Sequence, residues 1–159
     1  IQGDHTIMAT TKAPLHLDDL SLDILSETRV HATPDVVFAA LLEELGPANL
    51  GMHDAPMPMV LEAHPGGRWF RDLGENNGHC WGHVQAIRRP TLLEIAGPLM
   101  MSFAVASNVQ YRLKADGADT IITMRHTALG LFPEGYRENL GLGWKNISAR
   151  LQTRFPAIN

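Results

Sequence analysis

The chain has 159 residues, of which 45% are hydrophobic and 19% charged, a composition typical of a folded globular protein rather than a disordered one. Its formal net charge is −4 and its nearest approach to a basic cluster is Arg88-Arg89, so the charge pattern does not favour nucleic acid or an anionic membrane surface as partner. A single cysteine excludes an internal disulfide, and no apolar run approaches the roughly 18 residues of a membrane helix, so we expect a cytoplasmic protein without a membrane span.

The length is that of one domain. The sequence opens with Ile rather than Met, and its first residues lack the charged-then-apolar pattern of a signal peptide. We therefore interpret residues 1–10 as a tag remnant and disordered start, with Met8 as the native start. Residues 11–159 are expected to form the single domain.

Alternating residues over 20–32 predict a first strand, and the following segment predicts a short helix over residues 34–45. Thr33 suits the N-cap, and Pro34 suits the first helical position. The glycine-proline pair at 46–47 is a stop signal. The residues spaced for one buried face of this helix are Phe38, Leu41, Leu42 and Leu45.

A loop over residues 46–58 precedes a series of short strand-like segments joined by tight turns. The turns read PGG, GENNG, RRP and DGAD, and this spacing predicts an antiparallel meander rather than βαβ units. The predicted strand segments are PMVLEAH, RWFRDL, HCWGHVQAI, TLLEIAG, SNVQYRLKA and TIITMRHTAL.

The last predicted element is a long helix over about residues 134–155. Its apolar residues step by 4, 4, 3, 4 and 4 and are Tyr136, Leu140, Trp144, Ile147, Leu151 and Phe155. The predicted fold class is therefore α+β, with a curved antiparallel sheet of about six or seven strands around this helix. A sheet must bury its apolar face, and incomplete closure around the helix would leave a pocket beneath it.

This element order resembles the START-like (SRPBCC) superfamily with its helix-grip fold, and the branch it is most similar to is the heat-shock-protein ATPase activator homologue-like family of small bacterial proteins. The resemblance covers about residues 22–153. The strings that carry it are TPDVVFAAL, PGGRWFRDL, WGHVQAIRRPTLLEI, SNVQYRLKADGADTIITMRHTALG and GWKNISARL.

The resemblance implies a hydrophobic cavity between sheet and C-terminal helix that takes lipids, polyketides or other apolar small molecules. Some relatives are cyclases or hydrolases, but no shared catalytic motif transfers to this chain. Many members have an aromatic pair in the loop after the first helix, where this chain has ANLGMHDAPMP. We expect its methionines to take the place of that pair.

The stretch HCWGHV at residues 79–84 invites interpretation as a metal site. On a regular strand His79 and His83 lie about 13 Å apart, too far to share one zinc ion, and Cys80 points to the opposite face. We therefore predict no metal site. Val84 is expected in the core, which places Cys80 on the buried face and leaves Trp81 covering the outer surface of the sheet.

Two polar residues remain candidates for the interior. His126 shares a strand face with Ile122 and Met124, and it is either a core histidine bonded to backbone, which we favour, or a group at one end of the cavity. Arg71 shares a strand face with Trp69 and Leu73. It either faces the interior, where it needs an acid or an anionic ligand group, or lies on a solvated edge.

The leading hypothesis is a module that binds a hydrophobic or amphipathic small molecule between sheet and C-terminal helix, without cofactor and with a possible homodimer. Its alternatives are a cyclase- or hydrolase-type enzyme with His126 as acid or base, which requires that His126 is not fully enclosed, and a co-chaperone-like interaction module using loop 46–58. The predicted ligand-binding residues are Trp69, Arg71, Tyr111, Met124, His126 and Trp144.

Overall fold

The computed structural model describes residues 14–157, so the expected tag remnant at residues 1–10 lies outside the described part of the chain. The helical elements are α1 (Leu17–Leu20), α2 (Pro34–Leu45), the short 3-10 turn η1 (Met52–Asp54) and α3 (Tyr136–Arg154). The strands are β1 (Ser21–Val30), β2 (Val60–Leu61), β3 (Arg68–Gly74), β4 (Asn77–Arg88), β5 (Leu92–Gly97), β6 (Val105–Asp116) and β7 (Asp119–Gly130).

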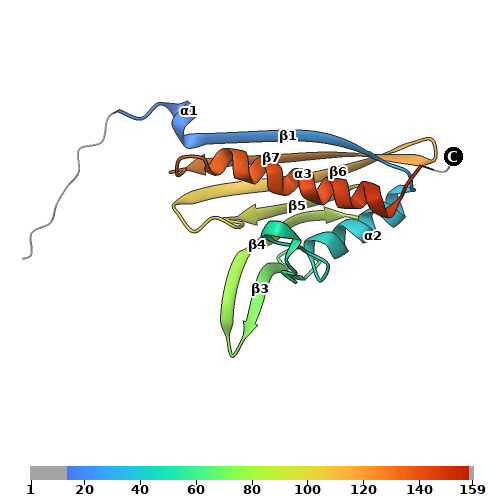
Figure 1. Cartoon of the computed structure of the whole chain (residues 1–159), viewed down its shortest axis with the longest axis horizontal. Helices are drawn as coiled ribbons and strands as arrows, with labels where there is room; N and C mark the ends of the chain where they lie inside the picture. The colour runs from blue at the N-terminus through green and yellow to red at the C-terminus, as the bar shows by residue number, and fades with distance from the viewer. Residues whose placement is uncertain (1–13, 158–159) are drawn as a thin grey trace, which may run out of the picture.

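The seven strands form one antiparallel sheet in the order β1-β7-β6-β5-β4-β3-β2. In Figure 1, α3 lies lengthwise over the sheet, and α2 lies near the C-terminal end of α3. The β3–β4 hairpin extends away from the two helices and the rest of the sheet. The predicted α+β class, with its curved sheet, short helix after the first strand and long C-terminal helix, is confirmed.

The helix α2 has the predicted bounds because its start and stop signals are local. Pro34 occupies the first turn after the N-cap Thr33, and Gly46 follows the last helical residue. On the predicted buried face Phe38 and Leu41 are enclosed, whereas Leu42 is only partly buried.

The helix α3 starts two residues later than predicted and turns its apolar stripe toward the sheet. The buried residues of the stripe are Leu140, Trp144, Ile147 and Leu151, while Tyr136 and Phe155 at its two ends are partly buried. The main core therefore lies between α2, α3 and the inner face of the sheet. No helix within residues 14–157 is both long and apolar enough to cross a bilayer.

Two irregularities in β4 bend the sheet. One falls between Val84 and Ala86. The other lies opposite the Trp69–Phe70 step, where Trp69 pairs with Gly82 and Phe70 with Cys80, so that Trp81 is an extra residue.

The second irregularity overturns two predictions about HCWGHV. Cys80 is exposed instead of buried, and Trp81, predicted on the outer surface, packs edge-on against the buried Trp69 with ring centroids 5.0 Å apart. The reason is the extra residue Trp81. Inward and outward side chains alternate from Val84 back to Gly82, but the alternation is broken at Trp81 and changes the face of Cys80. Cys80 also lies near the start of β4, where residues 77–80 are all exposed.

Candidate ligand site between the sheet and α3

Four of the predicted residues meet in the interior under α3. Tyr111 of β6 and Met124 of β7 are register partners, and both are almost completely buried. Trp144 of α3 lies edge-on to Tyr111 at 6.3 Å between ring centroids and edge-on to His126 at 5.5 Å. Strand alternation thus correctly places Tyr111, Met124 and His126 on the inner face.

The polar groups around His126 form one directed chain of hydrogen bonds. The indole Nε1–H of Trp144 donates to His126 Nδ1 at 3.0 Å, so the ring proton of the neutral imidazole is on Nε2. That nitrogen donates to Ser107 Oγ at 3.1 Å, and the Ser107 hydroxyl donates to the carbonyl of Gly97 at 3.0 Å. The chain links α3 to β7, β6 and the end of β5.

His126 is completely enclosed, with no exposed surface. Burial lowers the pKa of its imidazole to about 4, from an ordinary value of 6.5, because the charged form loses its hydration. Both ring nitrogens are engaged within the protein. The enclosed imidazole has no free nitrogen for a substrate, so His126 does not serve as the acid or base of a cyclase- or hydrolase-type reaction.

A different pair of polar atoms in the interior is unpartnered. The Tyr111 hydroxyl and Arg150 Nη2 are both buried, and neither has a hydrogen-bond partner among the described residues. Burial raises the pKa of Tyr111 far above its ordinary value, and the Arg150 guanidinium, close enough to act on the phenol, opposes that rise.

Arg150 is held by a residue of α2. Its Nε donates to Glu44 Oε2 at 2.6 Å, and Glu44 Oε1 accepts from Arg154 Nε at 2.9 Å. The Glu44 side chain is only 4% exposed, so this carboxylate depends on both arginines for its stability. The ion-pair network fixes α3 on α2, and Nη2 of Arg150 remains without a partner among the described residues.

No family model matches this chain, and no curated protein matches it. Solved structures do resemble it. CalU16 from Micromonospora echinospora matches with a TM-score of 0.60 at 20% identity, over 85% of this chain and 76% of its own. The di-domain ARO/CYC StfQ from the steffimycin biosynthetic pathway matches with 0.58 at 15%, over 87% and 51%. Ara h 8.0201 matches with 0.63 at 13%, over 84% and 97%.

These neighbours are helix-grip proteins of the START-like group. The protein has the START-like, helix-grip fold. The sequence resemblance is thereby confirmed at the level of the fold, whereas the ATPase activator homologue-like branch remains a prediction.

In this helix-grip protein the other two predicted ligand residues lie apart from the interior group. Trp69 is buried in the same core, but it packs on Trp81 and donates its Nε1–H to the carbonyl of Leu45 at 2.6 Å. Arg71 is partly exposed on the projecting hairpin, opposite His79. Of the two interpretations of Arg71, the structure matches the solvated edge.

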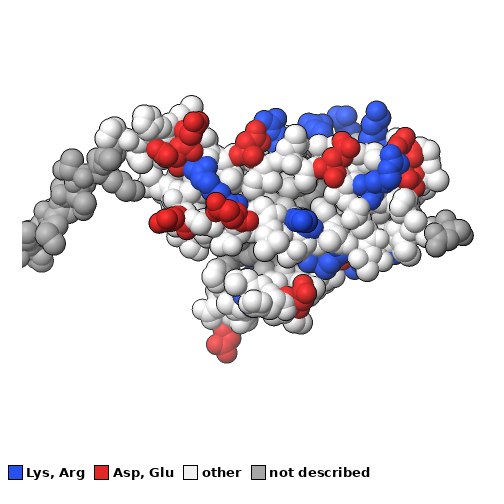
Figure 2. Space-filling model, turned by 45° about the horizontal axis from the view of Figure 1, so that its top comes forward, with Lys and Arg blue, Asp and Glu red and all other residues white. Residues whose placement is uncertain are grey.

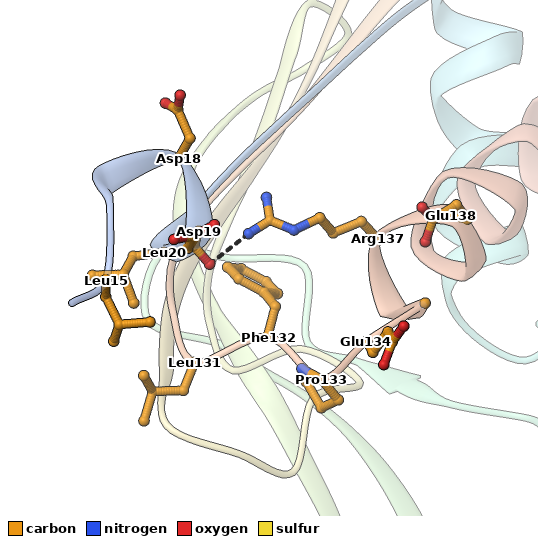
Figure 3. A pocket seen from close by; sticks show the side chains of 11 residues that line it. Leu15, Asp18, Asp19, Leu20, Leu131, Phe132, Pro133, Glu134, Arg137 and Glu138 are labelled. Carbon is orange, nitrogen blue, oxygen red and sulfur yellow. Dashed lines mark hydrogen bonds between the residues drawn. The ribbon is translucent and has the colours of Figure 1, made fainter. Parts of the chain in front are cut away.

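The described surface has two notable hollows, and neither lies between the sheet and α3. One, of about 620 Å³, borders the β3–β4 hairpin beside Arg71 and Cys80. The other, of about 520 Å³, lies beside α1 and the loop before α3 (Figure 3). There Arg137 donates to the carbonyl of Asp19 at 2.7 Å and covers the ring of Phe132 at 4.7 Å, so its charge is already engaged.

Residues 14–157 bring no group of three or more His, Cys, Asp or Glu side chains into position for a metal ion. On the face shown in Figure 2, acidic and basic side chains are interspersed rather than gathered by sign. Neither observation gives the surface of this helix-grip domain an obvious charged ligand site.

Sequence reasoning missed Ser107 and Arg150. Ser107 lies on the inward row of β6 two and four residues before Val109 and Tyr111, so alternation was a usable signal for it. Arg150 directly precedes Leu151 of the apolar stripe, and a charge beside a buried stripe is usually solvated. Only the buried Glu44 across the helix pair explains its inward position.

Proposed function

We propose that the protein binds an apolar or amphipathic small molecule between its sheet and α3. The observation that carries the proposal is the composition of this interior, where aliphatic, aromatic and methionine side chains surround very few polar groups. The shared fold with StfQ, described as an ARO/CYC of a biosynthetic pathway, adds support for an apolar, ring-containing ligand. Such a ligand would be held largely by burial of its apolar surface.

In the proposed site Tyr111, Met124 and Trp144 supply the walls, and Trp69 closes the end of the core beneath α2. His126 acts on the ligand through Trp144, because its hydrogen bond fixes the indole in one orientation. Arg71 takes no part in these walls, since it lies on the hairpin.

Ligand entry requires α3 to move, because its buried stripe closes the interior. The first half of α3 contains Gly141 and Gly143, and glycine is among the least helix-stabilising residues. This half covers a second, smaller apolar cluster that includes Leu140 and Met101. We propose that the glycine-containing half lifts to admit the ligand.

The alternative functions receive less support. A cyclase-type role needs a free acid or base, which the enclosed His126 does not provide. A co-chaperone-like surface on loop 46–58 needs an apolar patch, but of the two methionines in this loop Met57 is partly buried and only Met52 is strongly exposed, at 82%.

Isothermal titration calorimetry with 2-acetylnaphthalene tests the proposal. We expect saturable one-to-one binding by the wild-type protein. Ile147→Phe adds volume to the buried stripe and is expected to weaken binding at least tenfold, whereas Leu142→Phe, at a 57% exposed position of the same helix, leaves it unchanged. Absence of binding to wild type, or equal binding by the two variants, would contradict the proposal.

A further inference from the structure

Most polar side-chain groups in the interior under α3 have a hydrogen-bond partner, so the two that lack one are informative. The indoles of Trp69 and Trp144 and the imidazole of His126 all have protein partners. Within the described chain the buried side-chain atoms without a partner are the Tyr111 hydroxyl and Arg150 Nη2. Buried polar groups normally have hydrogen-bond partners, so an exception points to a group that is not part of the chain.

The two unpartnered groups lie within electrostatic reach of each other. Tyr111 is 2% exposed and reaches from β6 toward α3, where its ring meets that of Trp144. Arg150 lies six residues after Trp144 on the same helix, and its charge acts on the Tyr111 phenol. Its Nε–H donates to Glu44, and its Nη2 is buried without a partner among the described residues.

The chemistry of the two groups defines what they bind. Arginine only donates hydrogen bonds, and the tyrosine hydroxyl can donate one, so a single oxygen with two lone pairs satisfies both. The guanidinium of Arg150 favours an anionic oxygen, because hydrogen bonds between charged groups are stronger than those between neutral ones. A carboxylate would form such charge-assisted hydrogen bonds.

We propose that Tyr111 and Arg150 form the polar end of the ligand site and bind an acceptor oxygen of the ligand, a carboxylate in preference to a neutral carbonyl. This inference rests on the proposed function and adds the chemical class of the ligand: an apolar body with an acidic or carbonyl end.

Three probes with one ring system separate this inference from the proposed function. They are 2-naphthoate, 2-acetylnaphthalene and 2-ethylnaphthalene, which carry a carboxylate, a neutral carbonyl and no acceptor. Calorimetric titration of the wild-type protein is expected to show Kd values that rise in this order, with 2-naphthoate about tenfold tighter than 2-ethylnaphthalene, as expected for a hydrogen bond to a charged group.

Two variants and two matched controls assign the preference to these residues. Tyr111→Phe and Arg150→Lys are each expected to reduce the preference for 2-naphthoate to about twofold or less, with binding of 2-ethylnaphthalene retained. Tyr136→Phe removes a hydroxyl that already donates to Met100, and Arg154→Lys alters the other arginine on Glu44. Both controls are expected to keep the wild-type preference, and a thermal melt of each variant verifies folding.

The inference is overturned if the three probes bind wild type equally well, or if Tyr111→Phe and Arg150→Lys keep the full preference for 2-naphthoate. In both cases the proposed function survives, because the ring still binds. If none of the probes binds wild type, the proposed function fails, and the inference fails with it.

Discussion

The chain has two tyrosines, and their hydroxyl groups differ in what surrounds them. Tyr136 donates to the carbonyl of Met100 at 3.1 Å, whereas the Tyr111 hydroxyl is buried without a partner among the described residues. A buried polar group without a partner carries its desolvation cost and gains no bond in return. The two residues therefore form a natural pair for the same substitution.

We predict that Tyr111→Phe raises the free energy of unfolding of the ligand-free protein by about 1 kcal/mol, because it removes an unsatisfied hydroxyl. Tyr136→Phe is expected to lower it by about 1 kcal/mol, because it removes a hydrogen bond that is made. Urea denaturation of both variants measures the difference. A loss of stability in Tyr111→Phe would mean that its hydroxyl has a partner in the free protein.

The buried imidazole of His126 predicts a pH dependence of stability. Its pKa is about 4 in the folded state against 6.5 ordinarily, so between these values the unfolded chain binds the additional proton. The stability that the folded protein has with a neutral His126 is therefore complete above pH 6.5, and it declines as the pH falls toward 4. From pH 7.5 to pH 5 we expect the free energy of unfolding to fall by about 2 kcal/mol from this group.

Urea denaturation at the two pH values measures this slope. The variant His126→Gln is expected to lose most of the pH dependence, because glutamine does not titrate. His79→Gln, at an exposed position, serves as the control and should retain it. Equal slopes in wild type and His126→Gln would show that His126 is not the buried neutral group described.

Single positions also show where sequence reasoning succeeds and where it fails. His126 was predicted to face inward from the alternation of its own strand, which is local information. Its partners Trp144 and Ser107 are 18 and 19 residues away and come from other elements, so the hydrogen-bond chain required the fold. Cys80 was misplaced because one extra residue in β4 changes every face beyond it.

Among the elements, α2 could be predicted to the residue because a cap, a proline and a glycine mark its ends. The β2 strand is only two residues long, although the sequence PMVLEAH suggested more. The length of a strand depends on how many of its residues pair with a neighbouring strand. The sequence alone does not show that β3 pairs with only two residues of this segment. Elements with local end signals were thus predictable, and those limited by pairing were not.

The first half of α3 is predicted to gain stability from alanine. A Cβ at Gly141 or Gly143 would meet no atom within 4 Å, so neither glycine is required by packing. Each substitution to alanine is expected to raise the free energy of unfolding by about 1 kcal/mol through helix propensity. Urea denaturation tests the stability, and stopped-flow mixing with 2-acetylnaphthalene should show slower association if this half admits the ligand. Unchanged association would contradict the proposed entry route.

Gly82 in β4 is predicted to respond in the opposite way. A Cβ there would lie 2.6 Å from the carbonyl oxygen of Ala96 on β5, and this backbone atom has little freedom to move. We expect Gly82→Ala to lower the free energy of unfolding by about 1–3 kcal/mol through overpacking. Gly141→Ala is the matched control in the same denaturation assay, and a neutral effect at Gly82 would refute the close approach of the two strands.

At the scale of the whole molecule, α2 and α3 lie against one sheet (Figure 1). The side chains between them are aliphatic and aromatic, with few polar groups. The fold class followed from the order of elements, because a long amphipathic helix after an antiparallel meander has one large apolar face to cover. The polar end of the interior did not follow, because it forms only where β6, α2 and α3 meet. The proposed ligand site depends on that meeting point.

The most direct test of the central proposal is a ¹H–¹⁵N correlation spectrum of the protein titrated with 2-naphthoate. Each of the three tryptophan side chains contributes one indole resonance. Binding between sheet and α3 is expected to shift the indole resonance of Trp144 most strongly, because this ring contacts Tyr111 and His126. An unchanged Trp144 resonance at saturating probe, with shifts confined to the hairpin or to the hollow beside Arg137, would contradict the proposal.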